Sequence, residues 1–154
     1  MRSLLTWIAW VLLAFAATLP GAVSPPGEWY AALSKPDWTP AGWVFPVVWA
    51  TLYVCMGTAA WLVQRAGSAQ HPARGPLALF FVQLALNAAW TPIFFGLHAI
   101  FPALVVIVVL WVAILATLLA FRRVSTPAAW LFAPYLAWVS VALVLNFQIW
   151  RLNE

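Results

Sequence analysis

Four long stretches of the chain carry no charged side chain, and this pattern limits the folds that it can adopt. No Asp, Glu, Lys or Arg occurs between Arg2 and Glu28 (25 residues), Asp37 and Arg65 (27), Arg74 and Arg122 (47), or Arg123 and Arg151 (27). One helix that crosses a bilayer needs about 20 apolar residues. The stretch of 47 residues can hold two such helices joined by a hairpin. The pattern therefore predicts five membrane-spanning helices.

The composition supports a membrane protein with one domain. Hydrophobic residues make up 66% of the 154 residues and charged residues 6%, whereas a soluble domain is about half apolar and a quarter charged. We expect a single all-α domain over residues 1–154, with helices at about 4–23, 43–64, 76–95, 102–121 and 127–150. Gly96, Leu97 and His98, followed by Pro102, supply the hairpin between the third and fourth helices.

The first segment has two interpretations. Arg2 precedes an apolar run from Leu4 to Leu19 that is followed by small residues, as in a signal peptide. However, the apolar character continues to Val23, and no small-x-small cleavage site precedes Pro25. These features favour a helix that is retained.

The net charge of +4 is spread along the chain rather than gathered in a basic stripe, so we expect no nucleic-acid partner. Under the positive-inside rule, the basic residues of alternate connections fix the orientation. One side would hold Arg2, Arg65, Arg74, Arg122 and Arg123, and the other Lys35 and Arg151. This bias predicts a cytoplasmic N-terminus and an external C-terminus.

The predicted membrane segments contain no ionisable Asp, Glu, Lys or Arg, which argues against ion-coupled transport. His71 and His98 fall in different loops, and Cys55 lies in the second apolar stretch, far from both. We therefore expect no metal site and no hydrolytic centre. Cys55 is interpreted as a small buried hydrophobic residue.

The twelve tryptophans divide by predicted depth. Six fall near helix ends, where indoles anchor a protein at the headgroups: Trp7, Trp10, Trp43, Trp61, Trp130 and Trp150. Trp49, Trp90, Trp111 and Trp138 fall deeper. Trp111 has no polar neighbour along its helix and is interpreted as packing.

Neutral polar residues share helix faces with the deep tryptophans. Gln83, Asn87 and Thr91 recur every four residues, and Asn146 lies on the same face as Tyr135 and Trp138. These amides either join helices by hydrogen bonds or line an aromatic cavity for a flat apolar ligand. Small residues at four-residue spacing fit tight packing within the bundle or a dimer interface: Ala17 and Gly21, Ala85 and Ala89, Ala116 and Ala120.

Several motifs resemble the translocator protein family, also called tryptophan-rich sensory proteins or peripheral-type benzodiazepine receptors. The resemblance covers nearly the whole chain. It rests on Lys35-Pro36-Asp37-Trp38-Thr39-Pro40, Trp43-Val44-Phe45-Pro46 with Trp49, Gln83-Leu84 with Asn87, Trp90 and Phe94-Phe95, Pro134-Tyr135 with Trp138, and Leu145-Asn146 with Trp150-Arg151.

The resemblance implies a five-helix bundle whose ligand pocket is covered by the loop between the first two helices. It implies a multi-pass protein of a bacterial cell membrane, a homodimer in contact with lipid, with protoporphyrin IX or haem as ligand and no obligatory cofactor. Carried over by position, the ligand-binding residues are Trp38, Trp49, Asn87, Trp90, Tyr135, Trp138, Ala142 and Leu145. Porphyrin propionates would need polar or cationic groups near the mouth of such a pocket, and we expect Lys35, the one base on the first loop, to meet them.

The resemblance leaves the role open among three hypotheses: a tetrapyrrole receptor or sensor, an enzyme that degrades porphyrin in light through Trp49 and Trp138, and a tetrapyrrole or sterol transporter. In two places the chain departs from the family pattern. Ala41 replaces a second proline after Trp38, which suggests a looser lid. Phe147 replaces the tyrosine of the sterol motif between Leu145 and Arg151, so we do not expect high-affinity sterol binding.

Overall fold

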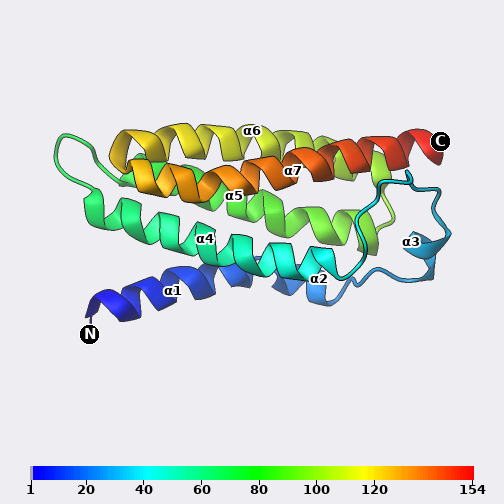
Figure 1. Ribbon diagram of the computed structural model, residues 1–154, viewed down its shortest axis with the longest axis horizontal. Helices are drawn as coiled ribbons and strands as arrows, with labels where there is room; N and C mark the ends of the chain where they lie inside the picture. The colour runs from blue at the N-terminus through cyan, green and yellow to red at the C-terminus, as the bar shows by residue number, and fades with distance from the viewer. Residues whose placement is uncertain (1) are drawn as a thin grey trace.

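The computed structural model describes residues 2–154, and every regular element within them is helical (Figure 1). The elements are α1 (Arg2–Ala16), α2 (Leu19–Ala22), α3 (Glu28–Ala32), α4 (Val44–Ala66), α5 (Arg74–Thr91), a π-helix η1 (Pro92–Gly96), α6 (Ile100–Val124) and α7 (Thr126–Leu152). The expected all-α membrane fold is confirmed.

Four helical segments are long and apolar enough to cross a bilayer: α4, α5 together with η1, α6 and α7. The first apolar stretch behaves differently, because α1 has only 15 residues. At 1.5 Å per residue it is about 22 Å long, shorter than the roughly 30 Å hydrocarbon core.

The helix expected over residues 4–23 is interrupted in the structure. The chain turns at Ala17 and Thr18 and resumes as the short helix α2. Pro20 explains the break, since proline has no N–H to donate and its ring clashes with the carbonyl four residues earlier, that of Ala16. The Thr18 hydroxyl donates to the Phe15 carbonyl oxygen over 2.8 Å and closes the end of α1.

The other expected helices differ from the observed ones by a few residues at each end. The expected hairpin is present, but its left-handed residue is His98 (φ 53°) and not Gly96, since no glycine has a positive φ within residues 2–154. The His98 ring stacks on Trp29 with centroids 4.2 Å apart. Pro92 marks the point where the α-helix gives way to η1.

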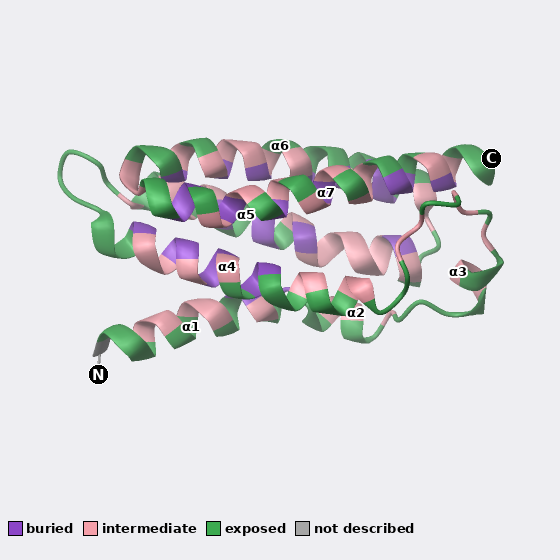
Figure 2. Ribbon diagram, viewed as in Figure 1, coloured by how far each residue is buried: buried purple, intermediate pink, exposed green. Residues whose placement is uncertain are grey.

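The helices form an elongated antiparallel bundle (Figure 1). α4 packs against α1 and α7, α6 packs against α7 and α5, and α2 contacts α5. The buried residues lie on the inward faces of these helices (Figure 2). The segment between α2 and α4, residues 23–43, crosses one end of the bundle and is called the lid.

The lid and the C-terminus share one end of the bundle, called here the lid end. The opposite end, called the N-terminal end, holds the N-terminus, the connection between α4 and α5, and the turn between α6 and α7 (Figure 1). Large apolar side chains remain exposed along the outside of the bundle, among them Leu5, Leu12, Val112 and Val144. An apolar exterior over an apolar core is what a protein dissolved in lipid requires.

Candidate functional site

Hydrogen bonds join three helices at the centre of the bundle. The Tyr53 hydroxyl on α4 donates to Oδ1 of Asn87 on α5 over 2.9 Å, and Nδ2 of Asn87 donates to the Tyr135 hydroxyl on α7 over 3.0 Å. All three side chains are buried. Burying polar groups costs free energy unless they are paired, so these bonds fix the three helices relative to one another. A ligand that bonds to Asn87 must compete with a tyrosine.

Trp49 lies against this hydrogen-bonded group. Its ring stacks on Tyr53, one turn later on α4, with centroids 5.5 Å apart, and meets the Tyr135 ring edge-on at 6.1 Å. The resemblance placed Trp49, Asn87 and Tyr135 in one site, and the structure brings them together. Tyr53 completes the group. It was not in the expected ligand set, although its spacing of four residues from Trp49 indicates that both lie on one face of the helix.

Trp138 has a buried Nε1 that has no hydrogen-bond partner within residues 2–154. This distinguishes it from Trp90 and Trp111, whose Nε1 groups donate to Asn146 and Ser140. The Phe45 ring meets the Trp138 ring edge-on, with centroids 5.7 Å apart. An indole N–H can only donate, so Trp138 presents an unused donor inside an aromatic surrounding.

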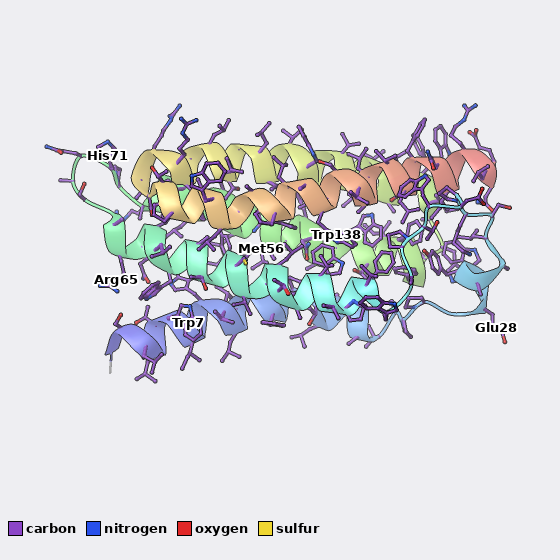
Figure 3. The ribbon with its side chains drawn as sticks, in the orientation of Figure 1. Trp7, Glu28, Met56, Arg65, His71 and Trp138 are labelled. Carbon is purple, nitrogen blue, oxygen red and sulfur yellow. The ribbon has the colours of Figure 1, made fainter. Side chains whose placement is uncertain are left out.

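Trp138 also lines an apolar groove between α4 and α7, and Figure 3 shows its position between these helices. The groove has a volume of about 430 Å³ and is lined by Val47, Val48, Thr51, Leu52, Pro134, Ala137, Trp138 and Val141. Sites for small molecules span roughly 300–1,000 Å³ and are mostly apolar with a few polar groups. The groove fits that description, with Thr51 as its one polar lining residue besides Trp138.

Trp90 belongs to a second aromatic group nearer the lid end. Its Nε1 donates to Oδ1 of Asn146 over 3.1 Å, and its ring stacks on Phe94 at 5.1 Å. Nδ2 of Asn146 in turn donates to the Ile100 carbonyl oxygen over 3.3 Å. Leu145 is buried in this group beside Phe94, while Ala142 is half-buried against the central core. Asn146, which was not in the expected ligand set, is the residue that holds Trp90 in place.

The side chains of Trp38 and Asn153 join the lid to the C-terminal part of the bundle. Trp38, which is 45% exposed, donates through Nε1 to Oε1 of Gln148 on α7 over 2.9 Å. Asn153 accepts from the Ser34 backbone N–H and donates to the Ser34 carbonyl oxygen, both over 2.9 Å. The expected pocket residue Trp38 is therefore held by Gln148 on α7, and it makes no ring contact with the aromatic groups described above within residues 2–154.

Lys35 is engaged within the lid rather than directed at a ligand. Its Nζ donates to the carbonyl oxygens of Tyr30, Leu33 and Ala31 over 2.6, 2.8 and 3.2 Å. An ammonium has three donors, so all of them are used. The expectation that Lys35 meets a porphyrin propionate is therefore not supported by its contacts.

The chain resembles known proteins over nearly its whole length. A family model described as the TspO/MBR family matches residues 5–151. Protein CrtK of Rhodobacter capsulatus is 42% identical over 151 residues, which covers 98% of this chain and 94% of that protein. The tryptophan-rich protein TspO of Chlorobaculum tepidum is 46% identical over 129 residues (83% and 82% covered), and the human translocator protein is 46% identical over 128 residues (82% and 76% covered).

Proposed function

Since this chain belongs to the TspO/MBR family, we propose that it is an integral membrane receptor or sensor that binds tetrapyrroles, such as protoporphyrin IX or haem, beside Trp138. Related proteins bear the names tryptophan-rich sensory protein and translocator protein. The proposal assigns to this chain a flat, largely apolar ligand held by aromatic contacts.

The unpaired Nε1 of Trp138 is the observation that carries the proposal. A buried donor without a partner costs free energy, of the order of 1–3 kcal/mol. A tetrapyrrole whose π-face lies against this N–H would accept a weak N–H···π contact and offset part of the cost. The neighbouring Phe45 ring and the apolar groove between α4 and α7 offer the aromatic and aliphatic surface that a macrocycle needs.

The position of the groove suits a ligand that reaches the protein through lipid. Its lining residues include Val47 and Val141, which are 58% and 40% exposed on the outside of the bundle. The interior amide of Asn87 is engaged by two tyrosines. We therefore propose that the macrocycle lies against Trp138. Its propionates would then lie at the level of the lipid headgroups, where Arg151 is the exposed cation of the lid end.

Titration of the purified protein with protoporphyrin IX in the dark tests the proposal. Trp138→Phe keeps an aromatic ring and removes the N–H, so we expect porphyrin binding to weaken by about tenfold, the equivalent of ~1.4 kcal/mol. Binding is measured by porphyrin absorbance, which does not depend on the number of remaining tryptophans. Trp130→Phe is the matched control, because Trp130 is 74% exposed near the start of α7, at the N-terminal end.

Trp138→Ala removes both the donor and the ring, and should weaken binding further than Trp138→Phe. The proposed site is wrong if Trp138→Ala binds protoporphyrin IX as tightly as the unmodified protein, or if Trp130→Phe weakens binding to the same extent.

A further inference from the structure

A second groove lies between α1 and α4 at the N-terminal end, far from Trp138. Its volume is about 310 Å³, and it is lined by Ser3, Thr6, Trp61, Gln64 and Arg65. Unlike the groove beside Trp138, it is lined mainly by polar side chains. Figure 3 shows Arg65 at this end of the bundle and Trp138 toward the other.

Arg65 is held in place but keeps most of its donors. Its Nη1 donates to the Ser3 hydroxyl oxygen over 3.3 Å, and its guanidinium lies 4.8 Å from the centroid of the Trp61 ring. A guanidinium carries five N–H donors, and the bond to Ser3 is the one hydrogen bond that the Arg65 side chain makes within residues 2–154. A planar group stacked in this way is oriented in advance for an anion with several oxygens.

Two further donors belong to residues that line the groove. Trp61 Nε1 is buried and has no hydrogen-bond partner within residues 2–154. Gln64 accepts from Trp10 Nε1 through its Oε1 over 2.7 Å, which leaves the NH₂ of its amide as a donor. α1 begins beside the groove, and the first N–H groups of a helix have no partner within it and favour anions.

No carboxylate of the chain lies near enough to neutralise this region. The three acidic residues are Glu28 and Asp37 in the lid and Glu154 at the C-terminus, all at the lid end. Arg74, Arg122 and Arg123 lie at the N-terminal end, in the first turn of α5 and the last turn of α6. The groove therefore holds a positive charge, that of Arg65, and the other charged residues named at this end are also basic. Such a region attracts an anion.

The surface beside the groove favours a lipid over a free anion. α1 exposes Leu5, Ile8 and Leu12, which are 63%, 37% and 64% exposed and follow one face of the helix at spacings of three and four residues. An acyl chain can lie along this face while its headgroup reaches the end of the helix. Trp61 is also of the type that lies at headgroup depth.

We propose that the groove between α1 and α4 binds the phosphate of an anionic phospholipid headgroup. Arg65 supplies the charge, Trp61 Nε1 and the Gln64 amide donate hydrogen bonds, and the apolar face of α1 supports an acyl chain. The proposal does not depend on tetrapyrrole binding, because the two grooves lie in different halves of the bundle and involve different residues.

The test follows thermal unfolding of the protein in neutral detergent during titration with phosphatidylglycerol, phosphatidylcholine or inorganic phosphate. A lipid that binds the folded state raises the midpoint with its concentration. We expect phosphatidylglycerol to bind more tightly than phosphatidylcholine and Arg65→Gln to weaken it by about tenfold, as the loss of one charge-assisted contact implies. Trp61→Phe keeps the ring beneath Arg65 and should give a smaller loss.

Arg122→Gln is the matched control, because it removes one exposed charge from the same end but from a helix that does not line the groove. It should leave phosphatidylglycerol binding unchanged. An equal loss in Arg122→Gln would mean that only general charge attracts the lipid, and an unchanged affinity in both Arg65→Gln and Trp61→Phe would likewise overturn the proposal. If inorganic phosphate alone reproduces the stabilisation, the groove binds a free anion and the lipid assignment is wrong.

Discussion

At the scale of single residues, two amides one turn apart on α5 have opposite surroundings. Asn87 is 6% exposed and has a tyrosine at each end of its amide, whereas Gln83 is fully buried and neither its Oε1 nor its Nε2 has a partner within residues 2–154. The sequence suggested that both could join helices. The structure assigns this role to Asn87, because the side chain that faces it from α4 is a tyrosine.

The difference between the two amides predicts opposite effects on stability. Gln83→Met keeps the length of the side chain and removes two unpaired polar atoms, so it should leave stability unchanged or raise it by about 1 kcal/mol. Asn87→Leu removes two hydrogen bonds between helices and should lower stability by about 1–2 kcal/mol. Thermal unfolding in detergent measures both. A loss in Gln83→Met as large as that in Asn87→Leu would show that the Gln83 amide is paired in the membrane.

At the scale of elements, the backbones of α1 and α4 lie in close contact at Gly57. A Cβ added at this position would lie 2.5 Å from the Val11 Cα and 2.8 Å from the Val11 nitrogen, both backbone atoms that cannot turn aside. The same contact is supported by Trp7, whose Nε1 donates to the Thr58 hydroxyl oxygen over 3.0 Å. Of the small residues noted in the sequence, Ala17 is buried in this part of the bundle, while Ala85 is exposed on α5.

Gly57→Ala should therefore push α1 away from α4 and destabilise the protein by about 1–3 kcal/mol. Gly75→Ala is the matched control, because no atom lies within 4 Å of a Cβ at that position in the first turn of α5. There alanine should be neutral or stabilising by up to about 1 kcal/mol, since it favours the helix more than glycine does. Equal unfolding midpoints for Gly57→Ala and the unmodified protein would contradict this packing.

At the scale of the whole molecule, charge is distributed unevenly between the two ends of the bundle. All three carboxylates lie at the lid end, and Arg65, Arg74, Arg122 and Arg123 lie at the other. The sequence analysis assigned the basic residues of alternate connections to opposite sides of the membrane. Because the bundle is antiparallel, these connections do lie at opposite ends of it. Under the positive-inside rule, this arrangement still predicts that the lid faces away from the cytoplasm.

Labelling of single cysteines in intact cells tests the orientation. On a Cys55→Ser background, a cysteine placed by Glu28→Cys in the lid should react with a thiol reagent that does not cross membranes, and one placed by His71→Cys should not. Both positions are exposed in the structure, so a difference in reaction reports the side of the membrane. After cell lysis both should react, which controls for accessibility. The reverse pattern would invert the predicted topology.

The sequence by itself determined the class of fold and the approximate limits of α4 to α7. In lipid every backbone polar group must be paired within the segment, so a long uncharged run becomes a helix whatever packs around it. The break in the first segment also has a local cause, Pro20. A count of uncharged residues does not detect it, because proline is itself uncharged.

The tertiary structure decided which side chains meet. Trp111 had no polar neighbour in its own helix, yet its Nε1 donates to Ser140 on α7 over 2.8 Å. Trp38, expected in a pocket, is held by Gln148, and Lys35 by carbonyl groups of its own loop. Such pairs depend on the rotation and depth of each helix against its neighbours, which are set by packing across the whole bundle and which no single apolar run contains.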